Sequence, residues 1–267
     1  MRDSISSISL LRALRDFGAA ARAVPRDISV VLIGASLVSI ASWYFGSRRF
    51  FRFMFYPFLG DRPLYELYEF LYWFGCEFVL CFVVPFLLAL IILHRKPRDI
   101  GVCIGDWKFG LKFACAFLVF MIPILWVVSD SPVFQTVYPH AQIVKGDWRL
   151  FLAYEAGFIF YFIGWEYLWR GFVLFGLEKH LGGGPSVLIQ MLPFVILHSG
   201  KPVLETLGAV VAGIALGALA LRTRSYWYGV LTHWSVMLTI DLFTTLRFRT
   251  GAAGIGIHAL FQLVGLS

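Results

Sequence analysis

Charge is scarce in this sequence. Asp, Glu, Lys and Arg make up 15% of its 267 residues, whereas soluble domains average about 25%. Hydrophobic residues make up 59% of the chain and gather in several long runs. This composition excludes an ordinary soluble domain. We therefore expect an all-α protein, a polytopic bundle of transmembrane helices.

Cysteine is also rare, and its spacing excludes two kinds of site. The chain has four cysteines, and no two of them form a CxxC pair. We interpret them as small apolar residues that fill space between helices. A disulfide framework or a zinc–thiolate site is therefore not expected. The four positions are Cys76, Cys81, Cys103 and Cys115.

The positive charge has a simple explanation at a membrane. The formal net charge is +7, and the Lys and Arg residues lie mostly in short segments beside the apolar runs. Membrane lipid explains this pattern better than nucleic acid does. Residues 1–27 mix arginines with Leu and Ile at the spacing of an amphipathic helix on a membrane surface. The loop charges favour a cytoplasmic N-terminus, in an integral protein of a bacterial plasma membrane.

Seven apolar segments predict seven membrane helices, or eight if residues 251–266 also cross. The fifth and sixth are shorter than the ~20 residues that span a bilayer core, so we expect them to pack inside the protein. Ala209, Gly213 and Gly217 recur every four residues, which favours close helix packing. We expect one membrane domain with a surface segment (1–27), scaffold helices (28–146), a working bundle (147–246) and a C-terminal tail (247–267). The apolar segments are 28–45, 70–93, 107–128, 151–177, 185–198, 206–221 and 226–246.

Ionisable residues interrupt the apolar second half. Glu166 and Arg170 are four residues apart in GWEYLWRG, so they share a helix face and can pair. A charge at the bilayer centre costs about 2.5–3.5 kcal/mol on insertion scales, which favours positions inside the bundle. His198 ends the fifth segment, and the seventh contains His233 and Asp241. Considered singly, each of these residues has a structural explanation: Glu166 and Arg170 as an ion pair that fixes helix packing, and each histidine as a buried side chain with its hydrogen bonds made inside the protein.

Taken together, one acid and two histidines on separate helices allow two kinds of chemistry. Glu166, His198 and His233 could hold a divalent metal such as zinc. Alternatively, the glutamate could act as a general base on water while a histidine orients the water or stabilises an oxyanion. Both routes lead to hydrolysis. Glu205 opens the sixth segment, where a helix N-terminus alone favours an acid.

Three short motifs carry a family resemblance. They are WEYLWR at 165–170, FVILH at 194–198 and HWSVM at 233–237. In order and helix placement they resemble the CPBP family of intramembrane proteases, also called the Abi family, which includes CAAX proteases and bacteriocin-processing enzymes. That family carries EExxxR, FxxxH and HxxxN or a variant. The resemblance covers about residues 147–246. It implies cleavage of a peptide bond at the membrane. In CAAX enzymes the cleaved bond follows a prenylated cysteine. Whether catalysis in the family needs a metal has been argued both ways.

Two positions depart from the family motifs. Trp165 stands at the position of the first glutamate of the family motif; in the prenyl endopeptidases, that glutamate looks like the residue that activates water. Met237 stands at the position of the polar residue that closes the third motif. Asp241 lies eight residues after His233, which rotates it by about 80° around a helix. The departures imply either a shifted site with Glu166 as the base or a protein that kept the fold and lost the chemistry.

Three hypotheses follow. In an intramembrane endopeptidase, Glu166 would activate water, His198 would hold it or bind a metal, and His233 would stabilise the oxyanion, with supporting roles for Arg170 and Asp241. The substrate would be a membrane-associated or lipidated peptide. The second is a non-catalytic immunity factor or peptide-binding scaffold. The third is a proton-coupled carrier with a polar path through Glu77 and Glu155, although the chain lacks paired halves with interrupted helices. A protease requires Glu166, His198 and His233 within hydrogen-bond or one-water reach of each other.

Overall fold

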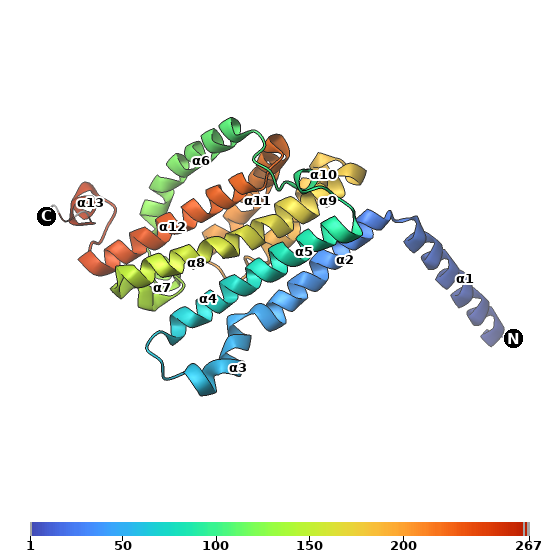
Figure 1. Cartoon of the computed structure of the whole chain (residues 1–267), viewed down its shortest axis with the longest axis horizontal. Coiled ribbons are helices and arrows are strands. Elements are labelled where there is room, and N and C mark those ends of the chain that lie inside the picture. The colour runs from blue at the N-terminus through green and yellow to red at the C-terminus, as the bar shows by residue number, and fades with distance from the viewer. Residues whose placement is uncertain (1, 264, 266–267) are drawn as a thin grey trace.

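The computed structural model describes residues 2–263 and 265, and over these residues the protein is a bundle of helices without strands (Figure 1). Each predicted apolar segment is helical. Short π-helical turns interrupt three of the long helices. The main helices are α2 (Arg26–Ala41), α4 (Tyr65–Glu77), α5 (Val84–Leu87), α6 (Trp107–Val128), α8 (Trp148–Glu166), α9 (Leu174–Leu181), α10 (Gly183–Ile196), α11 (Val203–Thr223) and α12 (Trp227–Thr250).

Five helical stretches in the described residues are long and apolar enough to cross a membrane. α10 is too short, because 14 residues extend only about 21 Å. α12 has 24 residues but is not among the five, and it carries His233 and Asp241 and ends in two arginines. The expected helical membrane bundle is therefore confirmed. The five stretches are Arg26–Leu59, Tyr65–Ile92, Trp107–Val128, Trp148–Leu181 and Val203–Thr223.

The centre of the bundle is one long helical stretch. It joins α8, the π-helical turn η6 (Tyr167–Val173) and α9, and 78% of its most apolar window is buried, against 11–33% for the other four stretches. In Figure 1, α8 runs between α4 and α12. Phe158 stacks on Phe74 of α4 with ring centroids 4.6 Å apart. Gly164 lies against the backbone of Glu77 and Phe78, where any Cβ would clash. This packing fixes the position of the next turn, which holds Glu166.

The helices α1 and α3 lie at the edge of the main bundle. α1 (Arg2–Ala23) projects away from it (Figure 1), and its Leu10, Leu14 and Phe17 are exposed. This is the geometry expected of an amphipathic helix on a membrane surface. α3 (Arg48–Leu59) was not predicted; it starts where the Ser47 hydroxyl accepts a hydrogen bond from Phe50 N. Shorter elements complete the chain: η1 (Ser42–Gly46), η2 (Phe78–Val83), η3 (Leu88–Ile92), η4 (Pro97–Ile100), α7 (Pro132–Val137), η5 (Gln142–Gly146) and α13 (Ile257–Leu263).

α10 and α11 form a tightly packed hairpin. Gly213 lies against Met191 and Phe194, and Gln190 Nε2 donates a hydrogen bond to Gly213 O at 2.8 Å. Gly217 lies against Gln190 in the same way. The small residues thus permit the close approach that their spacing predicted. The turn between the two helices carries His198.

Candidate active site

Glu166 is the centre of a buried polar cluster. It is the last residue of α8 and is fully buried. Its Oε1 accepts a hydrogen bond from His233 Nδ1 at 2.7 Å and another from Arg170 Nη1 at 3.2 Å. Arg170 is also fully buried, and its guanidinium carbon lies 4.0 Å from the centroid of the Phe194 ring. The structure therefore contains the predicted Glu166–Arg170 pair and extends it to His233.

A π-helical turn carries Arg170. The turn η6 begins directly after Glu166. Such turns are rare and occur frequently at functional sites. No residue pattern in the sequence predicted it.

Gly229 provides the space for the carboxylate. A Cβ at this position of α12 would lie 2.6 Å from Glu166 Oε2, so any larger residue would push against the carboxylate. Sequence reasoning missed Gly229, because glycine near the start of a helix carries no signal of a neighbour 63 residues away.

Both histidines have a defined tautomer. The Glu166 carboxylate only accepts hydrogen bonds, so His233 Nδ1 is the donor, and in the neutral ring His233 Nε2 carries the lone pair. His198 Nδ1 lies 2.6 Å from Phe194 O, and a carbonyl oxygen also only accepts. His198 Nε2 therefore keeps its lone pair as well. The two rings are nearly parallel, at 18°, with centroids 6.5 Å apart.

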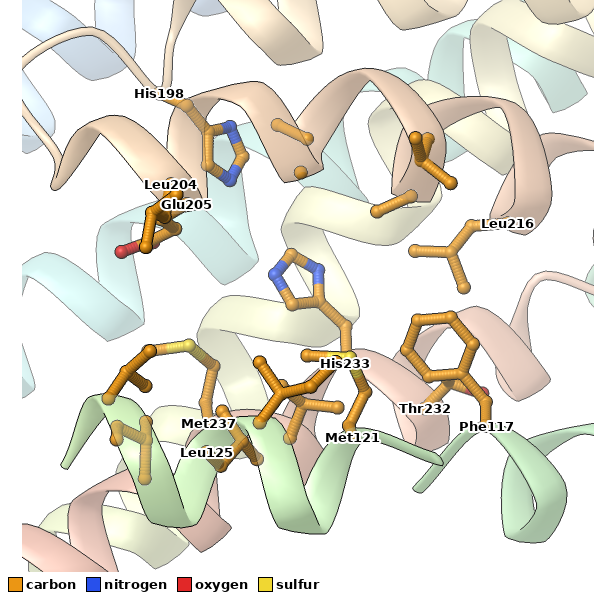
Figure 2. A pocket seen from close by; sticks show the side chains of 18 of the residues that line it. Phe117, Met121, Leu125, His198, Leu204, Glu205, Leu216, Thr232, His233 and Met237 are labelled. Carbon is orange, nitrogen blue, oxygen red and sulfur yellow. The ribbon is translucent and has the colours of Figure 1, made fainter. Parts of the chain in front are cut away.

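The two imidazoles share one cavity of about 440 Å³ (Figure 2). Helices α6, α11 and α12 supply most of its apolar wall. In Figure 2, His233 projects from α12 and His198 from the turn after α10, toward the same space. Glu166 does not line this cavity. Of the two histidines that line the cavity, His233 is the one that is hydrogen-bonded to Glu166. Five polar side chains line the cavity: Tyr138, His198, Glu205, Thr232 and His233.

A hydrogen-bonded network closes the polar end of the cavity. Lys201 Nζ donates to Tyr138 Oη at 3.1 Å and to His140 Nε2 at 2.9 Å. The Tyr138 hydroxyl donates to the Glu205 carboxylate, which lies 3.6 Å from Lys201 Nζ. Burial lowers the pKa of Lys201, and burial together with the Lys201 charge holds the pKa of His140 well below its usual range. Sequence reasoning missed Tyr138, His140 and Lys201, which belong to no recognisable motif.

Asp241 belongs to a different cluster. It is fully buried but does not line the cavity. Its carboxyl group faces that of Glu155 on α8, with Lys145 and Lys201 as the cations that act on it. Because α12 continues as a regular helix, the eight-residue spacing turns Asp241 away from His233. Of the predicted set, the structure brings together Glu166, Arg170, His198 and His233.

Residues 147–239 match the Rce1-like family of type II CAAX prenyl endopeptidases. Comparisons with curated proteins and with solved structures gave no match. The matched segment contains Glu166, Arg170, His198 and His233 and ends before Asp241. The family resemblance expected from the three motifs is therefore confirmed over these residues. It supports, at the level of the family, an integral membrane endopeptidase that acts on a membrane-associated peptide.

The two positions that depart from the CPBP motifs given above lie next to the histidines. The Trp165 ring lies 6.2 Å from the His198 ring and 5.9 Å from the Phe194 ring, between centroids. An indole therefore stands where the family motif has its first glutamate. Met237 lines the cavity one turn after His233. Neither side chain can accept a proton from water.

The predicted metal ligands do not converge on one point. Glu166 Oε1 accepts hydrogen bonds from His233 Nδ1 and from Arg170. The carboxylate therefore lies on the Nδ1 side of the His233 ring, away from the Nε2 atom of that ring. Among residues 2–263 and 265, no group of three or more His, Cys, Asp or Glu side chains has the arrangement of a metal site. A zinc site with Glu166, His198 and His233 as its three ligands does not fit this geometry.

Proposed function

We propose that this protein is a membrane endopeptidase in which His233, positioned by Glu166, takes the proton of the attacking water. The observation that carries the proposal is the 2.7 Å hydrogen bond from His233 Nδ1 to Glu166. It directs the lone pair of His233 Nε2 away from Glu166, in a cavity that His198 shares. A positioned histidine with a carboxylate behind it is the arrangement that hydrolases use for general base catalysis.

The reaction requires one water between the two imidazoles. The water donates one hydrogen bond to His233 Nε2 and one to His198 Nε2, which directs its oxygen lone pairs toward a substrate carbonyl. As the oxygen attacks the carbonyl carbon, the proton moves to His233 Nε2, and the Glu166 carboxylate stabilises the resulting imidazolium. The same proton then passes to the leaving nitrogen, the C–N bond breaks, and a carboxylic acid and an amine are released.

In this proposal Glu166 is a positioning residue. The motif pattern predicts that Glu166 is the base, but its full burial behind His233 supports an indirect role. Arg170 would hold the carboxylate in place through the 3.2 Å contact.

The substrate we propose is a membrane-associated peptide with an apolar or prenylated residue near the scissile bond. Leu204, Phe120 and Val211 line the cavity and are also about two-thirds exposed on the bundle surface. The cavity thus extends to the surface between α6 and α11, where a lipid-anchored segment could enter from the bilayer. We further propose that the protein lies in a bacterial plasma membrane with its N-terminus in the cytoplasm, following the loop charges.

One observation favours a second candidate, a non-catalytic protein that binds a membrane peptide. Every hydrogen-bond donor among the described side chains of the cavity is already engaged. Tyr138 donates to Glu205, Thr232 donates to Tyr228 O at 2.6 Å, and Met237 has no donor. A tetrahedral intermediate would therefore lack the oxyanion donors that usually contribute most to acyl-transfer catalysis. A carrier has less support, because Glu77 and Glu155 do not line this cavity.

The deciding experiment is proteolysis in detergent with matched farnesylated and unmodified peptides. Wild type would be compared with His233→Gln, His198→Gln and the control His258→Gln, which changes an exposed histidine of α13. Cleavage by wild type and the control, with loss in the other two variants, supports the enzyme. A chelator arm tests the metal prediction. Binding of the peptides without cleavage by a folded wild type would establish the non-catalytic alternative.

A further inference from the structure

A second cavity, of about 340 Å³, adjoins Trp165. It lies among α2 with η1, the start of α3, α4 with η2, and α8 with η6. Trp165 lines this cavity, while its ring also contacts Phe194 and His198, which line the first one. The second cavity has no part in the reaction proposed above.

Two buried donors in its wall have no acceptor. Trp165 is 9% exposed and Trp169 is 4% exposed. The indole Nε1 of each has no hydrogen-bond partner among the described residues. Buried N–H groups are almost always paired, with protein atoms or with a ligand or water. Two residues of one cavity wall thus carry unpaired donors, which a ligand with hydrogen-bond acceptors would satisfy.

Positive charge lies at the same cavity. Arg48 and Arg49, the first two residues of α3, line it. Arg48 and Arg52 both bind the single carboxylate of Glu69, with Arg52 Nη2 at 2.7 Å. Arg49 is exposed and forms no ion pair with any described residue. Three arginines against Glu69 leave two positive charges uncompensated, or one when Glu77, which also lines the cavity, is counted as a carboxylate.

The acid in the wall is hydrogen-bonded within the protein. Glu77 is 5% exposed, and its two carboxyl oxygens accept hydrogen bonds from the Ser42 hydroxyl and, at 2.9 Å, from the Cys81 thiol. Its acceptor atoms are therefore engaged within the protein. The free polar groups of the cavity are donors and cations.

The position of α3 indicates where the ligand comes from. Phe53 and Phe58 of this helix are 79% and 77% exposed, and its arginines lie at its start. A helix with exposed aromatics and basic residues is typical of the membrane interface, where lipid phosphates lie. The other walls of the cavity are largely aromatic, with Trp43 and Tyr161 among them.

We propose that this cavity binds an anionic phospholipid. The phosphate lies at Arg49 and Arg48, ester carbonyls accept from the indole N–H groups of Trp165 and Trp169, and the start of an acyl chain packs on the aromatic wall. A bidentate guanidinium–phosphate contact selects for the anion, and the indole contacts select for the lipid ester.

The test is lipid titration of the detergent-solubilised protein, followed by thermal unfolding and native mass spectrometry. Phosphatidylglycerol and phosphatidylcholine with identical chains would be compared. We expect saturable stabilisation by phosphatidylglycerol, at least tenfold weaker apparent affinity in Arg49→Gln and in Trp169→Phe, and wild-type affinity in Arg52→Gln. The last variant removes the same charge from the same helix, at a position that does not line the cavity.

Three results would overturn the proposal. Equal binding of both lipids would show that the arginines do not select a headgroup. Equal loss in Arg52→Gln and Arg49→Gln would show attraction to overall charge only. Full competition by soluble glycerol phosphate would show a site for free phosphate rather than for a lipid. None of these variants changes the proposed catalytic residues, so failure here leaves the proposed function untouched.

Discussion

Replacing Glu166 with glutamine tests whether this residue acts through His233. The variant keeps the size of the side chain but changes the group that faces His233 Nδ1. An amide can present its N–H₂ group to the ring, which forces Nδ1 to accept and moves the ring proton to Nε2. His233 Nε2 would then have no lone pair for the water proton. We expect kcat to fall by about 10²–10⁴-fold, the range of general base catalysis. KM should stay near the wild-type value, because Glu166 does not line the cavity.

The same substitution should also weaken the fold. Glu166 and Arg170 are both fully buried, and Glu166→Gln leaves the guanidinium without its counter-charge. Removing one partner of a buried ion pair costs about 3–5 kcal/mol. The cation–π contact of Arg170 with Phe194 offsets only a small part of this loss.

The assay must therefore separate activity from stability. Initial rates would be measured at a temperature at which the variant is fully folded, as judged by thermal unfolding in the same detergent. Arg170→Gln is the matched control. It breaks the same ion pair and should lose similar stability, but it keeps the carboxylate that accepts from His233, so its kcat should fall less.

The reasoning would be refuted by a folded Glu166→Gln protein with a kcat within threefold of wild type. A large rise in KM at constant kcat would refute it as well, because such a result would place Glu166 in contact with the substrate.

Three further predictions concern neighbouring groups. Gly229→Ala should lower kcat and should lower the free energy of unfolding by about 1–3 kcal/mol, because the new Cβ would lie 2.6 Å from Glu166 Oε2. Initial rates and melting temperatures of the variant check this prediction. Met237→Asn should raise kcat about tenfold, part of the 10²–10³ that an oxyanion donor contributes, and an unchanged kcat would count against the mechanism. Burial and Lys201 hold the pKa of His140 well below its usual range, so the folded protein excludes a proton that the unfolded chain binds below about pH 6.5. Melting temperatures should therefore fall from about pH 7 to pH 5, and His140→Gln should flatten this fall.

Much of the fold could be predicted from the apolar runs, because a long uncharged run has few alternatives to a membrane helix. The helix α3 escaped prediction for the same reason. Residues 48–59 begin with three arginines among aromatics, and the apolar run that follows, 53–59, is too short to cross a membrane. The Ser47 cap and contacts with α4 define the helix.

Four ionisable residues of the candidate site were predictable, but its geometry was not. Glu166, Arg170, His198 and His233 stood out because ionisable groups are costly inside apolar helices. Whether Glu166 or His233 faces the cavity depends on how α8 is rotated against α12. That rotation is set by contacts such as Gly164 with α4 and Gly229 with the carboxylate, which no spacing along the chain encodes.

The central position of α8 has a consequence for biosynthesis. Trp148–Leu181 has a mean hydropathy of 1.2, the lowest of the five candidate spans, and the preceding three have values of 1.9, 2.6 and 2.4. Among the five candidate spans, the stretch that holds Glu166 thus has the weakest preference for lipid when it leaves the translocon. It needs α2 and α4, which pack against this stretch, already in the bilayer to provide protein surface in place of lipid. A chain that begins at residue 147 should therefore fail to integrate, although it contains Glu166, His198 and His233.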